Sequence, residues 1–230
     1  MPGAGEEIKL TTRNDATEQE LRREIVRFSK WLYRLGYMPG TSGNLSVRLD
    51  EQRLLVTPTG ISKYRLRQTD LTIVDINGCQ LEGARKATSE IGMHLAFYRQ
   101  REDVAAVIHS HPPVATAFAC AGWALDEMLC QEAVMTLGPV PLAGYATTGT
   151  DEVAASLNPF IPAYDAMLLA NHGAVTCGAT LQEAFFKMET LEHVAQIRLA
   201  AHQLGTYTTL EQEQEEHLRR AKQRYIENAV

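Results

Sequence analysis

Residues 104–113 have the sequence VAAVIHSHPP, which combines an apolar run, two histidines and two prolines. The run 104–109 is apolar up to its histidine, which is typical of a strand buried on both faces of a sheet. Two prolines then end the strand. The flanking sequence predicts a helix on each side of it, at 89–101 and at 113–121. This arrangement favours a fold in which helices cover a central sheet.

The N-terminal part of the chain predicts one helix followed by hairpin strands. Thr17 and Glu20 form a capping-box pattern, and apolar residues at helical spacing extend the helix over 17–35. Apolar and alternating runs predict strands at 45–49, 53–57 and 71–76, and the turn sequence Asn77-Gly78 ends the last of them.

Beyond residue 150 the predicted elements alternate. We expect a helix within 151–163, a strand at 166–170, a long helix at 180–204 and a charged helical tail, while 122–150 receives no firm assignment. This order predicts an α/β protein, a three-layer α/β/α sandwich around a mixed, largely antiparallel central sheet. The expected division is a flexible N-terminal arm at 1–16, one domain at 17–209 and the tail at 210–230.

The composition is that of a folded globular domain. Of the 230 residues, 45% are hydrophobic and 22% are charged, which argues against extensive disorder. The net charge of −6 argues against nucleic acid as a partner, and no apolar run reaches the roughly 18 residues of a membrane-spanning helix. The N-terminus shows no export-signal pattern. We therefore expect a cytoplasmic protein without a membrane partner, in which the four cysteines are reduced thiols.

Histidines follow two of the predicted buried strands. His109 and His111 stand at the end of the first strand, where residues two apart project to the same side of an extended chain. His172 follows the strand at 166–170. If the two strands are neighbours, three imidazoles converge, and three histidines with an open position form the ligand set of catalytic zinc sites. An isolated His-x-His pattern also occurs in histidines that bind no metal.

Glu90 opens the helix at 89–101. A carboxylate is stabilised there by the helix dipole, and it is also placed to act as a fourth ligand or a general base. His94, one turn further on, is interpreted as a core histidine or a neighbour of the ligands rather than a ligand. Three loops of small residues, at 41–44, 59–60 and 88–89, offer backbone N–H groups and hydroxyls to an anion, although each alone is also an ordinary turn.

Together these patterns resemble the class II aldolase and adducin family. The matching motifs are Gly40-Thr41-Ser42-Gly43-Asn44-Leu45-Ser46, Thr57-Pro58-Thr59-Gly60, Ser89-Glu90, His109-Ser110-His111 and Asn171-His172-Gly173. They keep the family's order across 18–205, which is specific to the family but less specific to one reaction. Within the family, the chain looks most like the fuculose-phosphate aldolases, because the sugar-phosphate 4-epimerases usually carry Asp in place of Glu90.

The resemblance implies a metal-dependent aldolase that cleaves a ketose 1-phosphate reversibly to dihydroxyacetone phosphate and an aldehyde. It also implies a ring-shaped homotetramer with active sites at the subunit interfaces. One divalent ion per subunit, zinc above Mn, Co or Fe, would be held by His109, His111 and His172, with Glu90 as a ligand at rest and a base during turnover. The substrate phosphate would be held by Ser42, Gly43, Asn44, Thr59, Gly60, Thr88 and Ser89.

One departure from the fuculose-phosphate aldolases concerns the proton donor to the aldehyde. Those enzymes place a tyrosine near Cys130, whereas Gln131-Glu132 here resembles the methylthioribulose-phosphate dehydratases. Glu132 is therefore a second candidate acid/base, or else a surface acid in a loop, and Tyr207 and Tyr225 are alternative donors. A dehydratase, 4-epimerase or decarboxylase that uses Glu132 is the alternative function. An adducin-like interaction module is disfavoured because adducin lacks the metal histidines.

Overall fold

The computed structural model describes residues 17–228, with side chains to residue 224, so the arm expected at 1–16 lies outside the described residues. At the centre is one eight-stranded sheet in the order β4-β3-β2-β1-β5-β8-β7-β6. Its strands are β1 (Asn44–Arg48), β2 (Arg53–Val56), β3 (Thr72–Asp75), β4 (Gln80–Glu82), β5 (Ala106–Ser110), β6 (Leu142–Ala143), β7 (Ala166–Leu169) and β8 (Gly173–Gly178). In the described part of the chain, β6 and β7 form the only parallel pair, which confirms the prediction of a mixed, largely antiparallel sheet.

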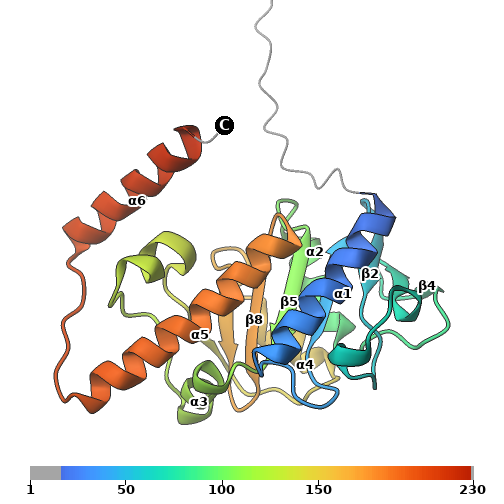
Figure 1. Ribbon diagram of the computed structural model, residues 1–230, viewed down its shortest axis with the longest axis horizontal. Coiled ribbons are helices and arrows are strands. Elements are labelled where there is room, and N and C mark those ends of the chain that lie inside the picture. The colour runs from blue at the N-terminus through green and yellow to red at the C-terminus, as the bar shows by residue number, and fades with distance from the viewer. Residues whose placement is uncertain (1–16, 229–230) are drawn as a thin grey trace, which may run out of the picture.

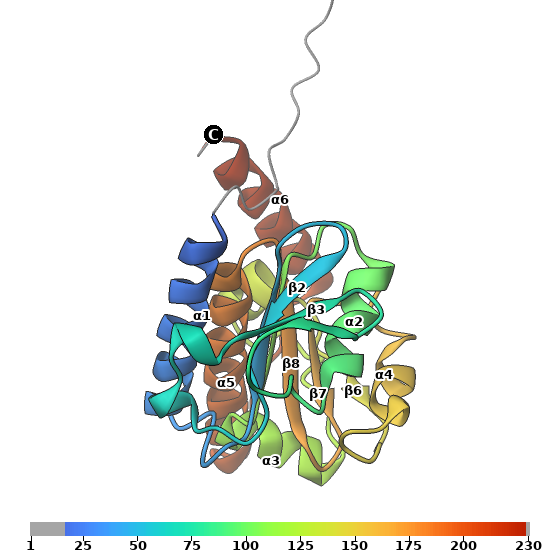
Figure 2. The same ribbon diagram turned by 90° about the vertical axis from the view of Figure 1, so that its right-hand side faces the viewer.

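The helices cover both faces of this sheet, as the edge-on view shows (Figure 2). One layer holds α1 (Glu18–Arg34), α3 (Pro113–Ala121) and α5 (Leu181–Gln203), and the other holds α2 (Ile91–Gln100) and α4 (Asp151–Leu157). Each layer has its own apolar core against one face of the sheet, because successive strand residues point to opposite faces. Ile108, for example, packs toward α1 and α5, whereas Val107 packs toward α2 and α4. The predicted three-layer sandwich is therefore confirmed.

Local sequence signals explain where the long helices begin. The Thr17 side chain accepts a hydrogen bond from the Glu20 backbone N–H, and Glu20 reaches back to the Thr17 backbone, so the predicted capping box is present. Thr180 caps α5 in a similar way by accepting from the Glu183 N–H. The buried face of α1 consists of Leu21, Ile25, Phe28, Ser29 and Leu32.

Strand β8 has no counterpart in the sequence prediction, although it lies between β5 and β7 near the middle of the sheet. Its sequence is short and bounded by glycines, which are poor strand residues when the sequence is considered alone. The chain reverses tightly after β7 through Asn171, which adopts a left-handed conformation with φ 56°. This reversal places the following residues beside β7, where they pair with it as β8. Within the unassigned stretch 122–150, the structure forms β6 and a short π-helix, η3 (Ala133–Leu137).

The C-terminal helix α6 (Gln212–Asn228) extends away from the sandwich (Figure 1). Leu210 and Leu218 pack against a small apolar cluster that includes Val134 of η3 and Val194 of α5. Among the described residues, no helix has the length and apolar character needed to cross a bilayer. All four cysteines are free thiols, as predicted. Two short 3-10 turns, η1 (Lys63–Arg65) and η2 (Gln68–Asp70), connect β2 to β3.

Candidate active site

His109 and His111 stand at the C-terminal end of β5. The ring of His109 is fully buried, and its Nδ1 lies 2.9 Å from the carbonyl oxygen of Ala174 on β8. A carbonyl can only accept, so Nδ1 carries the proton and Nε2 of the neutral ring presents a lone pair. Metal-binding histidines are commonly oriented in this way by a carbonyl on the second ring nitrogen.

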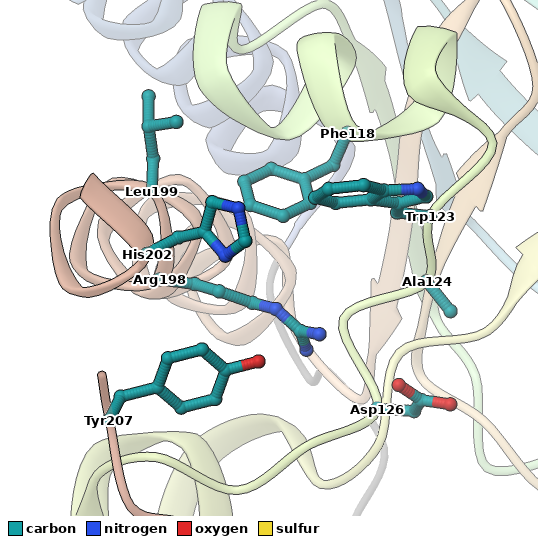
Figure 3. A pocket seen from close by; sticks show the side chains of 8 residues that line it. All are labelled: Phe118, Trp123, Ala124, Asp126, Arg198, Leu199, His202 and Tyr207. Atoms are coloured by element: carbon teal, nitrogen blue, oxygen red, sulfur yellow. The ribbon is translucent and has the colours of Figure 1, made fainter. Parts of the chain in front are cut away.

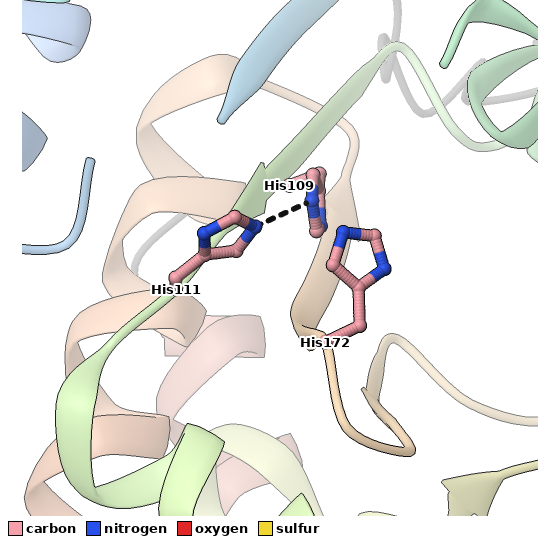
Figure 4. A group of neighbouring side chains, drawn as sticks. All are labelled: His109, His111 and His172. Atoms are coloured by element: carbon pink, nitrogen blue, oxygen red, sulfur yellow. Dashed lines mark hydrogen bonds between the residues drawn. The ribbon is translucent and has the colours of Figure 1, made fainter. Parts of the chain in front are cut away.

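His172 is brought to the same place by the reversal between β7 and β8. Its ring centroid lies 4.6 Å from that of His109 and 5.2 Å from that of His111 (Figure 4). The three histidines each offer a ligand nitrogen, and these nitrogens all lie within 4.8 Å of one another. The convergence predicted from two neighbouring strand ends is therefore present, although the strands β5 and β7 are separated by β8.

Glu90 faces this cluster from the start of α2. Its Oε1 lies 3.3 Å from Nε2 of His172, and its Oε2 lies 3.5 Å from Nε2 of His109. Oε2 also accepts a 2.7 Å hydrogen bond from the Asn44 side-chain amide. Oε1 is buried and accepts no hydrogen bond from any residue that the structure describes. A buried carboxylate oxygen without a partner requires an explanation, and a role as a ligand for a cation would supply one.

The imidazoles are held in the form that binds metals. Burial is the main cause that lowers the pKa of each ring, and it takes His109 well below its usual value. Burial, the neighbouring His172 and the charge of Lys63 together lower the pKa of His111 to about 4. Near neutral pH the rings are therefore uncharged, and Nε2 of His109 accepts a 3.1 Å hydrogen bond from Nε2 of His111 that a metal ion would replace (Figure 4). Three neutral imidazoles beside an unpartnered carboxylate oxygen fit a divalent transition-metal ion.

A polar cavity of about 480 Å³ opens in front of these groups. Glu90, His111 and His172 lie on its wall, whereas His109 is buried behind them. All seven residues predicted to hold a phosphate also line it: Ser42, Gly43, Asn44, Thr59, Gly60, Thr88 and Ser89. The three loops that carry them come from different parts of the chain and are joined by backbone hydrogen bonds, such as that from the Thr88 N–H to the Thr57 carbonyl.

Lys63 is a residue of this cavity that the sequence analysis missed. Its side chain is buried, and the ammonium group donates hydrogen bonds to the carbonyl oxygens of Thr41 and Ile61 at 3.2 and 3.3 Å. Among the described residues that line the cavity, it is the only lysine or arginine. Its position four residues after Thr59 was the available signal, because a lysine close to an anion-binding loop is itself a candidate ligand for phosphate.

The second acid/base candidates are not among the described residues that line this cavity. Glu132 is exposed at the start of η3. Tyr207 lines a separate cavity of about 370 Å³ beside Trp123 and Arg198 (Figure 3), and its hydroxyl donates to Glu127 at 3.0 Å. Tyr225 lies in α6, but its side chain is outside the described part of the chain. Among the described residues of one chain, the structure therefore brings together the metal and phosphate candidates without Glu132 or Tyr207.

A comparison with known families identifies the family to which this chain belongs. The profile described as "Class II Aldolase and Adducin N-terminal domain" matches residues 23–199. The chain belongs to the class II aldolase and adducin family. The class II aldolases depend on a metal ion, and His109, His111 and His172 form the group in the described residues that could bind one.

Relatives of this class II aldolase family member carry several activities. It is 35% identical over 202 residues to a 5-deoxy-D-ribulose 1-phosphate aldolase of Bacillus thuringiensis serovar kurstaki, covering 87% of this chain and 94% of the relative. It is 38% identical over 185 residues to a 3-oxo-tetronate 4-phosphate decarboxylase of Escherichia coli K12, covering 78% and 86% of the two chains. A solved L-fuculose 1-phosphate aldolase superposes with a TM-score of 0.82 at 32% identity, covering 90% of this chain and 97% of that one.

Proposed function

We propose that this protein is a metal-dependent aldolase that cleaves a ketose 1-phosphate reversibly to dihydroxyacetone phosphate and an aldehyde. The observation that carries the proposal is the shared cavity, in which the wall with Glu90, His111 and His172 faces the small-residue loops. An acid/base and candidate metal ligands thus lie in one space with donors suited to a phosphate. The similarity to two sugar-phosphate aldolases supports the same reading.

The residues that we assign to the metal are His109, His111 and His172, with Glu90 as a ligand in the resting site. Zinc is favoured by three imidazoles and a carboxylate, and Mn, Co or Fe would suit the same donors. When bound, a divalent cation would act as a Lewis acid that stabilises negative charge developing on the substrate oxygens.

Glu90 is the proposed acid/base at the carbon that reacts. In cleavage, the C3–C4 bond of the ketose phosphate breaks and its electron pair passes to the fragment that becomes dihydroxyacetone phosphate, to which Glu90 delivers a proton at C3. In condensation, Glu90 removes that proton. In the cleavage direction, the C4 hydroxyl also loses its proton to a second acid/base as C4 becomes the aldehyde carbonyl. Glu132 is our candidate for that role, supplied from a neighbouring subunit.

The substrate phosphate would be held away from the reacting carbons. Backbone N–H groups and hydroxyls of the three loops are suited to an anion, and Lys63 adds a fixed positive charge. Binding at the phosphate fixes the position of C3 relative to Glu90, which converts binding energy into orientation.

The direct test is release of dihydroxyacetone phosphate. Metal-loaded protein is incubated with fuculose, rhamnulose and 5-deoxyribulose 1-phosphates, with a chelator as the control. Release of dihydroxyacetone phosphate that the chelator abolishes would support the aldolase proposal. The rates with the three substrates would rank the aldehydes that the enzyme accepts. No release from metal-loaded protein with any of the three would contradict it.

A second candidate is a decarboxylase that acts on a 3-oxo acid phosphate. The relative of that activity matches at an identity comparable to the aldolases, and both reactions leave a carbanion next to a carbonyl. A dehydratase or a 4-epimerase would use the same site with Glu132. The role of Glu132 is tested by comparing Glu132→Ala with the exposed control Glu102→Ala. Loss of turnover in Glu132→Ala alone would indicate that Glu132 acts on the substrate.

We also propose a homotetramer with interfacial active sites, as the resemblance to the family implies, because such an assembly would bring Glu132, which does not line the cavity of its own chain, to a neighbouring site. Light scattering coupled to size-exclusion chromatography tests the assembly, and a monomeric active enzyme would contradict it. A cytoplasmic location is proposed from the metabolic reactions of the relatives.

A further inference from the structure

A line of buried polar side chains runs from Glu90 into the protein interior. The Asn44 amide nitrogen lies 2.7 Å from Glu90 Oε2, and the Asn44 amide oxygen lies 2.5 Å from His94 Nε2. On the other side of the ring, His94 Nδ1 lies 2.7 Å from Ser46 Oγ, which lies 2.8 Å from the Tyr98 hydroxyl. Asn44 and Ser46 belong to β1, whereas His94 and Tyr98 lie on α2. The line therefore joins the sheet to the helix that carries Glu90.

Every donor and acceptor in this line follows from the carboxylate at one end and from the single proton of a neutral imidazole. An ionised carboxylate only accepts, so the Asn44 amide nitrogen donates to Glu90. The Asn44 amide oxygen must then accept, and His94 Nε2 carries the proton. His94 Nδ1 is left with a lone pair and accepts from the Ser46 hydroxyl, which in turn accepts from Tyr98.

The electrostatic environment agrees with these assignments. His94 is fully buried, and burial lowers its pKa to about 3, so the ring is neutral and has one N–H. Burial also raises the pKa of Tyr98, so its hydroxyl keeps the proton that it donates. Tyr98 is only 4% exposed, so water has little access to compete for these groups.

We infer that His94, supported by Ser46 and Tyr98, is a positioning residue that locks the Asn44 amide and thereby holds one oxygen of Glu90 in place while the other faces the histidines. This inference rests on the proposed role of Glu90. Asn44 alone would be a weak restraint, because the two ends of an amide have nearly the same shape. A flipped Asn44 would turn its oxygen toward the carboxylate and repel it, and His94 Nε2–H prevents the flip by requiring an acceptor.

A carboxylate that transfers a proton benefits from this asymmetry. Oε2 is occupied by Asn44, whereas Oε1 is buried without a hydrogen bond among the described residues and lies 3.3 Å from Nε2 of His172. The fixed orientation keeps Oε1 at the reacting side, and supports of this kind typically change activity by about 10- to 100-fold when they are removed. A network that only filled the core would affect stability and leave the chemical step unchanged.

The first test compares His94→Phe with His94→Gln. Phenylalanine has the shape of the ring without a donor, whereas glutamine places an amide N–H near the position of Nε2. Exchange of the C3 hydrogen of dihydroxyacetone phosphate in D2O follows the proton transfer without any aldehyde. We expect His94→Phe to lower kcat by about 10- to 100-fold with little change in metal content, and His94→Gln to recover most of it.

The control is Thr176→Val, which removes a buried hydroxyl on β8 that donates to the Ala184 carbonyl outside this line. It reports the effect of lost stability alone and should leave kcat unchanged. The inference would be overturned if the wild type is active and His94→Phe has the same kcat. It would also be overturned if His94→Gln folds but is as slow as His94→Phe. A wild type without any exchange would instead contradict the proposed function.

The second test needs neither activity nor metal. In metal-free protein labelled with ¹⁵N-histidine, NMR correlation of the ring nitrogens with the ring protons identifies the tautomer of each imidazole. We expect the His94 ring to be neutral with its proton on Nε2. We also expect its NMR signals to keep their intensity when phosphate is added. A proton on Nδ1, or a charged ring, would overturn the inference whatever the enzyme's reaction proves to be.

Discussion

At the scale of single residues, Glu90 is distinguished by the different surroundings of its two oxygens. One accepts a hydrogen bond from Asn44, and the other faces His172 without a hydrogen bond from any described residue. The carboxylate is 12% exposed, so its position is set by the protein rather than by solvent. A substitution of Glu90 can therefore separate the loss of acid/base function from the loss of metal binding.

We expect Glu90→Gln to retain the metal and to lose turnover. The amide keeps an oxygen of nearly the same shape, and the three imidazoles are untouched, but it cannot accept the C3 proton. General acid–base catalysis contributes about 10²- to 10⁴-fold, so kcat should fall at least 100-fold. Metal content by mass spectrometry and turnover are measured on the same preparation, with the exposed Glu82→Gln as the control. Full activity in Glu90→Gln would remove it from the mechanism.

Lys63→Met should weaken phosphate binding without changing the metal site. The variant removes the fixed cation of the cavity while filling the same space. A hydrogen bond to a charged group contributes about 1.5–3 kcal/mol, so KM for a phosphorylated substrate should rise about 10- to 100-fold. The exposed Lys86→Met is the matched control. An unchanged KM would show that Lys63 only ties the loops together.

Phosphate affinity should depend on pH through the same residue. Burial lowers the pKa of Lys63 to about 8. The charged form that attracts phosphate therefore prevails below pH 8 and is lost as the pH rises through this value, so binding should weaken above it. Calorimetric titration of metal-free protein with inorganic phosphate from pH 7 to 9 measures the effect. Over this range the affinity of the wild type should fall more than that of Lys63→Arg, in which only the protonation of phosphate itself changes, and equal pH profiles would contradict the prediction.

At the scale of elements, the β7–β8 hairpin performs two tasks. Its turn presents His172, and its first β8 residue, Gly173, leaves room for His111. A Cβ atom at Gly173 would lie 2.5 Å from Cδ2 of His111 and 2.7 Å from the Ser110 carbonyl oxygen. The glycine is required by this close approach of two strands.

Gly173→Ala should therefore displace His111 and weaken metal binding. Disturbing the support of a ligand typically costs about 10- to 100-fold in metal affinity. The affinity is measured by competition with a coloured chelator. Gly144→Ala is the control, because a Cβ there meets no atom within 4 Å. Equal affinities in the two variants would show that the strands can move apart at no cost.

At the scale of the whole molecule, one carboxylate joins the two helical layers across the sheet. Asp165, just before β7, accepts hydrogen bonds from Lys187 of α5 at 2.7 Å and from Arg101 at the end of α2 at 2.6 Å. Burial alone would raise the pKa of Asp165, but the charges and hydrogen bonds of Lys187 and Arg101 outweigh it and hold the pKa below its usual 3.8.

Asp165→Asn should lower the free energy of unfolding at neutral pH by about 1–3 kcal/mol. The pKa of Asp165 is lower in the folded state, so its contribution is present above about pH 4 and is lost as the pH falls. The difference between wild type and variant should therefore shrink from pH 7 to pH 3 in urea denaturation. Asp103→Asn, at a more exposed partner of Arg101, should change stability by less than about 0.5 kcal/mol. A constant difference across this pH range would contradict the linkage.

The sequence by itself determined most of the elements and the candidate ligands. Capping residues, helical spacing and apolar runs are local signals, so α1, α5 and β5 could be predicted from neighbouring residues alone. The motifs around His109, His111 and His172 indicated a metal because residue type and position at strand ends are both visible in the chain. The seven small residues of the phosphate loops followed from the family resemblance and line one cavity.

Only the tertiary structure decided what depends on contacts between distant segments. Strand β8 forms because β5 and β7 pair with both of its edges, which its glycine-bounded sequence does not reveal. Lys63 is a cavity residue because the loop at Thr41 folds over it, and His94 supports Glu90 because α2 packs on β1. Burial and hydrogen-bond direction are properties of the packed molecule, so these assignments required the fold.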